Sequence, residues 1–187
     1  MDRENVKFVG ITCEMAIAQC ISNAEPSALI LAGQRFFCWY LQAHETEVDI
    51  IAVTNHAIYS IESKDFPSFI KGEFQDYEWL GQARNPRILT IHNPIHQNLA
   101  HIRFIKKFIF DRFGVWVMVH NFVVVPDSCR IRSSCKEVVH ASELYTRIQQ
   151  VESESSVIDR DIIYRELYYG IPKEYAYLME KFRQGLL

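Results

Sequence analysis

The chain has 187 residues, and its apolar fraction of 49% is enough to build the core of a single domain. Its net charge of −3 does not point to a generally basic nucleic-acid-binding protein, and the absence of a signal peptide and of an apolar run of roughly 18 residues argues against a membrane or secreted protein. The five cysteines are odd in number and include no Cys-x-x-Cys pair, so we expect reduced thiols, no zinc site and a cytoplasmic location.

Three elements are predicted before the first hairpin, namely a helix over residues 12–22 and strands over 28–32 and 35–41. Thr12 can cap the helix, and Glu14 lies in its first turn, where a carboxylate suits the helix dipole. Gly33 separates the two strands and is interpreted as a turn between them.

The segment over residues 47–64 predicts a β-hairpin, because two apolar runs flank an Asn-His pair that is typical of a turn. Loops of two or four residues give the same register, which places Asp49 directly opposite Glu62, with Cβ atoms about 5 Å apart. Lys64 lies two residues beyond Glu62 and therefore points to the same face of the sheet. Two carboxylates at this spacing are unfavourable unless a cation lies between them, so the hairpin predicts a divalent-metal site beside a lysine.

A surface charge network is the alternative interpretation of the same hairpin. The register also sets Glu47 opposite Lys64, and exposed ion pairs are common and contribute only about 0–1 kcal/mol. Against this, the two strands are strongly apolar and are typical of the centre of a sheet, where an uncompensated charge is unfavourable.

The chain beyond the hairpin is predicted to contain one long helix followed by a strand and further helices. The elements are a polar loop over 68–92 with a short strand pair, a helix over 94–113, a strand region over 115–125, and helices over 142–150, 156–169 and 173–184. Ser142 is a candidate cap, and the chain after Pro126 is expected to be helical. This order predicts an α/β sandwich around a mixed sheet.

The long helix has clear boundaries and a polar line beside its apolar stripe. Asn93 is suited to cap it, Pro94 occupies the first helical position, and Gly114 ends it. Asn93, Gln97 and His101 are spaced four residues apart and fall on one line of the helix, which could border a site.

The segment over residues 84–112 has an excess of bases over acids and is a candidate strip for the nucleic-acid backbone. Its candidate contacts are Arg84, Arg87, Arg103, Lys106 and Lys107. A solvated helix face is the equally open alternative.

The order of these features resembles the nuclease-related domain (NERD) family of the PD-(D/E)xK restriction-endonuclease-like superfamily. The shared features, over roughly residues 10–125, are helical Glu14, strand residue Asp49, the triplet Glu62-Ser63-Lys64, Trp79, and the helix start Asn93-Pro94-x-x-Gln97. Val48 stands where the name motif of the superfamily has proline. The resemblance implies a nuclease domain over residues 1–130 with a mixed central sheet flanked by helices. Residues 131–187 would form a helical extension, packed on that domain or used for partner contact.

The resemblance also implies roles for the site residues. Asp49 and Glu62 would bind Mg²⁺, with Mn²⁺ as a substitute, and Lys64 would orient or activate the attacking water. Glu14 would complete the site and Gln97 would join it from the following helix. None of His92, His96 and His101 is expected to be a metal ligand.

The leading hypothesis is therefore a metal-dependent endonuclease that cleaves nucleic acid, DNA rather than RNA, in defence, mobile-element maintenance or DNA processing. One alternative is a module of the same fold that binds nucleic acid without cutting it. Another is an interaction protein whose C-terminal helices form a homodimer or recruit a partner. A run of five tyrosines and one leucine suggests this interpretation, and the same run could equally pack on the parent domain. Its members are Tyr164, Leu167, Tyr168, Tyr169, Tyr175 and Tyr177.

Overall fold

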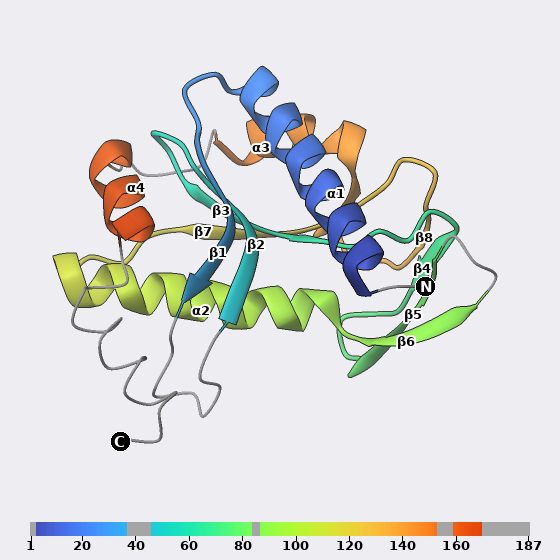
Figure 1. The fold of residues 1–187 in the computed structure, drawn as a ribbon. Helices are drawn as coiled ribbons and strands as arrows, with labels where there is room; N and C mark the ends of the chain where they lie inside the picture. The colour runs from blue at the N-terminus through green and yellow to red at the C-terminus, as the bar shows by residue number, and fades with distance from the viewer. Residues whose placement is uncertain (1–2, 37–45, 84–86, 153–158, 170–187) are drawn as a thin grey trace.

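The computed structural model describes residues 3–36, 46–83, 87–152 and 159–169, and its main feature is a five-stranded mixed sheet (Figure 1). In spatial order the strands are β1 (Leu29–Phe36), β2 (Thr46–Val53), β3 (Ile58–Ser63), β7 (Val119–Val125) and β9 (Val138–His140). The first three are antiparallel neighbours, whereas β3, β7 and β9 run parallel to one another.

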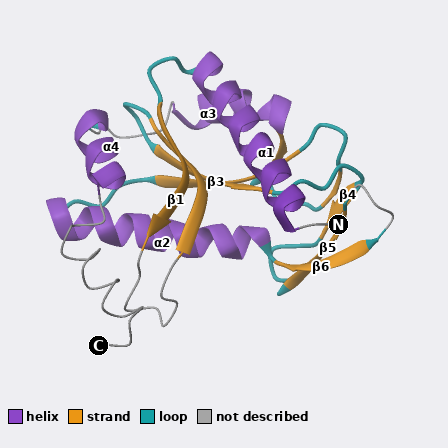
Figure 2. Ribbon diagram, viewed as in Figure 1, coloured by secondary structure: helices purple, strands orange, loops and turns teal. Residues whose placement is uncertain are grey.

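Helices cover both faces of this sheet (Figure 2). They are α1 (Arg3–Ala24), α2 (Pro94–Phe113), α3 (Leu144–Glu152) and α4 (Arg160–Tyr169). Helices α1 and α3 pack on one face through Ile17, Ile21 and Ile148, and α2 and α4 cover the other face through Ile105 and Leu167. The predicted α/β class, a mixed sheet flanked by helices in a restriction-endonuclease-like core, is confirmed.

The register of the central hairpin is the predicted one. Strands β2 and β3 pair with Ile50 opposite Ile61. One residue further along both strands, the same register brings Asp49 opposite Glu62. The meeting of the two carboxylates therefore follows from the pairing of their strands.

Strand β1 is continuous, so the predicted turn at Gly33 is wrong. The strand pairs with β2 on both sides of this residue, with Ala32 opposite Ile50 and Gln34 opposite Val48. Gly33 has a φ of 60°, which glycine adopts without a Cβ clash, and the chain continues in the same strand beyond it. The rest of the predicted second strand, from residue 37, lies outside the described residues.

A second sheet occupies much of the segment that the sequence predicts as a polar loop. In spatial order its strands are β6 (Ile88–His92), β5 (Glu78–Gln82), β4 (Phe69–Lys71) and β8 (Arg130–Arg132). The predicted short pair is present as β4 and β5, whereas β6 was not predicted. The inner face packs around the buried side chains of Ile70 and Trp79 and against Ile95 of α2.

The prediction that the chain is helical after Pro126 is wrong, because β8 and β9 both lie there. Each has three residues, too few to show the alternation by which a strand is recognised. Ser142 lies within a 3₁₀ turn over Ala141–Glu143, and α3 begins only at Leu144, so Ser142 does not cap it. The division of the chain at residue 130 stays a prediction.

Helix α2 has the predicted boundaries. The side-chain oxygen of Asn93 accepts hydrogen bonds from the backbone N–H groups of Ile95 and His96, and Gly114 ends the helix in the left-handed conformation. The strand predicted over 115–125 is regular only from Val119.

Helix α4 packs on the core through Ile163 and Leu167, while Tyr168 and Tyr169 are exposed. The helix predicted over 173–184 lies outside the described residues. Within the described part of the chain, no helix combines the length and the apolar character needed to cross a membrane.

Candidate active site

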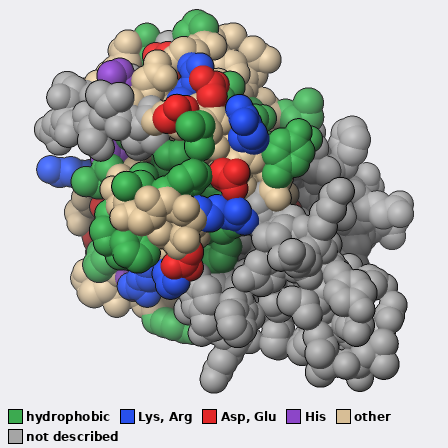
Figure 3. All heavy atoms as spheres, turned by 90° about the vertical axis from the view of Figure 1, so that its left-hand side faces the viewer, with side chains coloured by type: hydrophobic (Ala, Val, Ile, Leu, Met, Phe, Trp, Pro, Cys, Tyr) green, Lys and Arg blue, Asp and Glu red, His purple; other side chains and the backbone are tan. Residues whose placement is uncertain are grey.

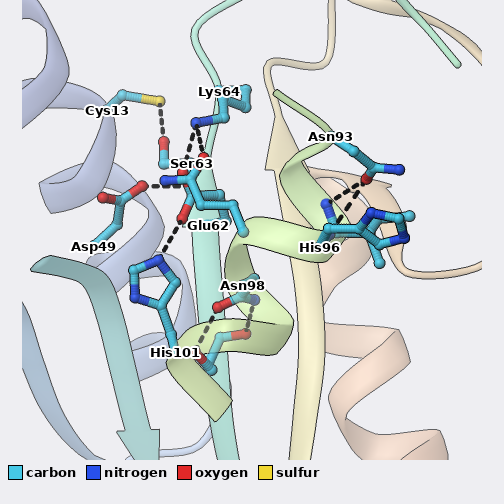
Figure 4. Close-up of polar contacts among 12 residues, drawn as sticks. Cys13, Asp49, Glu62, Ser63, Lys64, Asn93, His96, Asn98 and His101 are labelled. Atoms are coloured by element: carbon cyan, nitrogen blue, oxygen red, sulfur yellow. Dashed lines mark hydrogen bonds and ion pairs between the residues drawn. The ribbon is translucent and has the colours of Figure 1, made fainter. Parts of the chain in front are cut away.

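The site lies where β3 ends, between α1 and the first turns of α2 (Figure 4). Its central residue is Glu62, which is 1% exposed. The Oε1 atom of Glu62 accepts a hydrogen bond from Nζ of Lys64 at 2.5 Å. The Oε2 atom is buried and has no hydrogen-bond partner, and it lies 3.8 Å from Nε2 of His101. A buried carboxylate oxygen without a partner is unfavourable and is open to a cationic ligand.

The second carboxylate, Asp49, is held by the backbone of the neighbouring strand. Its Oδ2 atom accepts a hydrogen bond from the N–H of Ser63 at 2.8 Å. Burial raises the pKa of Asp49, against the lowering effects of this hydrogen bond and of the Lys64 charge. Burial also raises the pKa of Glu62 to about 7, with Lys64 lowering it and Asp49 raising it further. The positive charge of Lys64 therefore does not offset the effect of burial on the pKa of the two carboxyl groups.

Helix α1 brings a third carboxylate, Glu14, to the same end of the sheet. Burial and the negative charges of Asp49 and Glu47 raise the pKa of Glu14 to about 7. The hydroxyl of Ser63 donates a hydrogen bond to Sγ of Cys13 at 3.4 Å, which joins α1 to the end of β3 beside Glu14. Because the charge of Asp49 raises its pKa, Glu14 belongs to the same group of interacting carboxylates.

Helix α2 contributes Gln97, whose Oε1 atom accepts a hydrogen bond from Nζ of Lys64 at 3.2 Å. The lysine is therefore held between a carboxylate of its own strand and an amide of the following helix. The structure brings together the predicted catalytic residues, which are Glu14, Asp49, Glu62, Lys64 and Gln97. Their catalytic roles remain predictions.

Two further α2 side chains belong to the surroundings of the site. His101 is 4% exposed, and burial, with the charge of Lys64, lowers its pKa to about 4, so the imidazole is neutral at pH 7. The helical spacing of Asn93, Gln97 and His101 already pointed to this residue. The fully buried Asn98 donates hydrogen bonds to the carbonyl groups of Ser60 and Phe122 and so joins α2 to β3 and β7. No signal in the sequence distinguished Asn98 from a solvated asparagine.

The site fits a divalent metal held by few protein ligands. Within the described residues, no group of three or more His, Cys, Asp or Glu side chains is arranged to hold a metal ion. Mg²⁺, however, is commonly bound by one or two carboxylates and keeps several waters. The unpartnered Glu62 oxygen and the neighbouring Asp49 carboxylate match that requirement.

None of the predicted basic contacts that the structure describes forms an ion pair with Asp49 or Glu62. Arg103 and Lys107 are on the exposed side of α2, and Lys107 forms an ion pair with Asp111. Arg87 is exposed just before β6, and Lys106 is half-buried. Arg84 lies outside the described residues.

The mixed sheet, with an acid pair and a lysine at the end of its central hairpin, is that of a restriction-endonuclease-like protein. A comparison with protein-family models matches residues 10–126 to the nuclease-related domain, NERD. The match covers more than half of the chain, and the protein belongs to this family. Comparisons with curated proteins and with solved structures gave no match. Membership indicates a nuclease-related function.

The raised pKa of Glu62 predicts a pH-dependent difference between the wild type and Glu62→Gln. The folded carboxyl group titrates at about 7 and the unfolded one near its ordinary value of 4.5. Between these values the folded state holds a proton that the unfolded state has released, so the stability from this group is lost as the pH rises through about 7. Glutamine does not titrate. Without divalent metal, we expect equal stabilities near pH 4.5 and a more stable Glu62→Gln variant above pH 7.

Urea unfolding of both proteins at about pH 5 and about pH 8 measures this difference. Gln149→Glu, which places a carboxylate at an exposed position of α3, is the control and should show no comparable change. A difference between wild type and Glu62→Gln that is the same at both pH values would contradict the burial of a titrating carboxylate.

Proposed function

We propose that the protein is an endonuclease that requires Mg²⁺, with Mn²⁺ as a substitute, and that hydrolyses phosphodiester bonds of DNA in preference to RNA. The observation that carries the proposal is the acid pair of Asp49 and the buried Glu62, in which Oε2 of Glu62 has no hydrogen-bond partner and Lys64 lies alongside. Family membership supports a nuclease activity. The choice of Mg²⁺, of DNA as the substrate and of cleavage within the strand is our own proposal. Roles in defence, mobile-element maintenance or DNA processing would suit such an activity.

Asp49 and Glu62 are the residues that would hold the metal. When bound, Mg²⁺ lowers the pKa of a water ligand and stabilises the negative charge that develops on the phosphoryl oxygens. Glu62 can serve only when it is ionised, so metal and proton compete for it. The pKa of about 7 places this competition close to physiological pH.

Lys64 would act on the attacking water or on a phosphate oxygen. An ammonium group has three N–H donors, and two of them are directed at Glu62 and Gln97. The third can donate to a water or to a substrate oxygen, in a position fixed by the other two. Its positive charge favours the hydroxide form of the nucleophile and the anionic transition state. Gln97 is then a positioning residue that holds the lysine.

Incubation of plasmid DNA, single-stranded DNA and RNA with Mg²⁺, Mn²⁺ or EDTA tests the proposal. We expect metal-dependent nicking and linearisation of the plasmid, loss of cleavage in EDTA, and loss of cleavage in Asp49→Ala and Lys64→Ala. Cleavage that persists unchanged in both variants would rule the site out. Salt-dependent binding without turnover under any metal condition would favour the module that binds but does not cut.

A further inference from the structure

The outer face of the second sheet carries a set of cations that the site does not use. Residues that pair across neighbouring strands share a face. Lys71 pairs with Arg132, and Arg130 lies opposite Phe69 of the same strand as Lys71. Ile70 and Ile131 between them turn to the core. Lys71, Arg130 and Arg132 therefore lie together on the opposite side, and all three are exposed.

These three cations have no acidic partner among the described residues. The acid on the same face, Glu78, is two residues along β5 from Leu80, the partner of Lys71, and forms no ion pair with a described cation. Glu73, beyond the end of β4, is held by hydrogen bonds from the N–H and hydroxyl of Ser134. By contrast, Lys107 and Arg112 of α2 are paired with Asp111 and Glu166. Two of the α2 cations are therefore neutralised by acids, whereas none of the three cations on the sheet face is paired with a described acid.

Apolar side chains continue the same face beyond the cations. The guanidinium group of Arg132 lies over the ring of Phe69, 4.9 Å from its centroid, so the two side chains are in cation–π contact. Leu80 is 40% exposed and Ile88 is 55% exposed, and both lie on this face by their pairing. Cations beside flat and apolar side chains are the combination that binds the backbone and the bases of nucleic acid.

Two strands of this sheet, β4 and the edge strand β6, are connected by short segments of chain to elements of the candidate active site. Strand β4 begins a few residues after Lys64, and β6 leads through Asn93 into α2, which carries Gln97. In Figure 1 the second sheet lies at the end of the molecule where α2 begins. A nucleic acid that lies on the sheet face would therefore be held at the end of the molecule where α2 begins.

We propose that the outer face of the second sheet binds the sugar-phosphate backbone of a nucleic acid through Lys71, Arg130 and Arg132. The inference rests on the proposed function for its biological meaning, because the nucleic acid held there would be the substrate. The binding of nucleic acid to the sheet face does not itself require a metal ion. Unpaired cations on a rigid sheet attract phosphates whether or not the acid pair is occupied, and the binding releases counterions from the nucleic acid.

The test is binding of fluorescently labelled single-stranded and duplex DNA to the full chain, measured by anisotropy in EDTA at several salt concentrations. For Arg130→Gln/Arg132→Gln, we expect the salt slope of binding to duplex to fall by about 2, and that to single strands by about 1.4. The dissociation constant at about 0.1 M salt should rise by on the order of ten-fold or more. Lys71→Gln alone should lower the duplex slope by about 0.9.

Arg165→Gln on α4 is the matched control, because it removes an exposed cation far along the chain from the sheet. Figure 3 shows the end of the molecule that carries α4, where acidic and basic side chains adjoin in the part not drawn in grey. This variant should bind as the wild type does. A second comparison is Arg103→Gln/Lys107→Gln, which should change the slope less than the sheet variants do.

Three results would overturn the inference: sheet variants that keep the wild-type slope, α2 variants that lose more of it than the sheet variants, or a wild type that binds no DNA. Circular dichroism of each variant checks its folding, and Lys71→Gln provides a second reading if the double variant does not fold. The proposed function is judged separately by cleavage with Mg²⁺. A wild type that cleaves DNA while the sheet variants bind normally refutes only the inference, and a wild type that binds through the sheet without cleaving refutes only the nuclease.

Discussion

Replacement of Lys64 by glutamine is expected to reduce metal-dependent cleavage by about 10²–10⁴-fold. Glutamine keeps a hydrogen-bond donor of smaller reach but removes the positive charge next to the reacting phosphate. The two carboxylates that we propose to hold the metal remain, so Mn²⁺ binding should be retained. Initial rates of plasmid nicking at saturating Mg²⁺ measure the effect, with Mn²⁺ binding measured on the same protein.

Lys136→Gln is the matched control for this experiment. Lys136 is an exposed lysine in the loop between β8 and β9, and its removal changes the net charge by the same amount. We expect the control to cleave as the wild type does. If Lys64→Gln retained a rate within a few-fold of the control, the lysine would not act on the reacting groups, and its contact with Glu62 would be only an ion pair.

Replacement of Asn98 by leucine is expected to destabilise the protein by about 3–5 kcal/mol. The amide nitrogen of Asn98 donates to the carbonyl oxygen of Ser60 at 2.7 Å and to Oδ1 of Asn121 at 2.7 Å, and Phe122 supplies a third acceptor. Leucine leaves these buried groups without their donor, and each such loss costs about 1–3 kcal/mol. Urea unfolding of wild type and variant at one pH measures the difference.

Ser60→Ala is the control, because it removes one hydrogen bond to Asn98 and leaves the rest of the network in place. The Ser60 hydroxyl donates to Oδ1 of Asn98, and its loss leaves the three acceptors of the Asn98 amide in place. We expect a loss of about 1 kcal/mol. Equal effects of the two substitutions would contradict the role of Asn98 as the anchor of α2. A variant that folds but no longer fixes the position of α2 should also cleave more slowly, because Gln97, which contacts Lys64, is adjacent to Asn98 in this helix.

The sequence was sufficient to predict the site where local rules act strongly. A turn centred between Asn55 and His56 sets Asp49 opposite Glu62 whether its loop has two or four residues. The start of α2 followed from Asn93 and the proline after it, and the family resemblance then assigned Gln97 to the site, where it accepts a hydrogen bond from Lys64. The register and the helix start used only neighbours within one element or one turn.

The parts that escaped prediction depend on contacts between distant segments. Strand β8 exists because Arg130–Arg132 pairs with β4, and β9 because it pairs with β7, and neither has enough residues to show a pattern of its own. Gly33 has the residue type of a turn, yet its pairing with β2 on either side keeps it within a strand. The environment of His101 and Asn98 was equally hidden, since their burial is decided by the sheet against which α2 packs.

The prediction of a basic strip over residues 84–112 was limited in the same way, because the sequence does not show which cations are paired with acids in the folded protein. The excess of bases in the sequence pointed to α2, but two of its cations are paired with acids in the folded protein. Lys71, Arg130 and Arg132, which have no acidic partner among the described residues, come from β4 and β8, which are far apart in the chain and adjacent in the sheet. A pattern in one segment could not reveal a surface assembled from two.

Binding of Mn²⁺ to the free protein, followed by the electron paramagnetic resonance of unbound Mn²⁺, tests the central claim most directly. We predict that the wild type binds Mn²⁺ with an affinity that increases as the pH rises through about 7, where Glu62 loses its proton. Above pH 7, where Glu62 of the wild type is ionised, Glu62→Gln should bind at least about ten-fold more weakly, and its affinity should show no such increase from this residue. Equal binding by wild type and Glu62→Gln, or no binding by either, would contradict a metal held by Asp49 and Glu62.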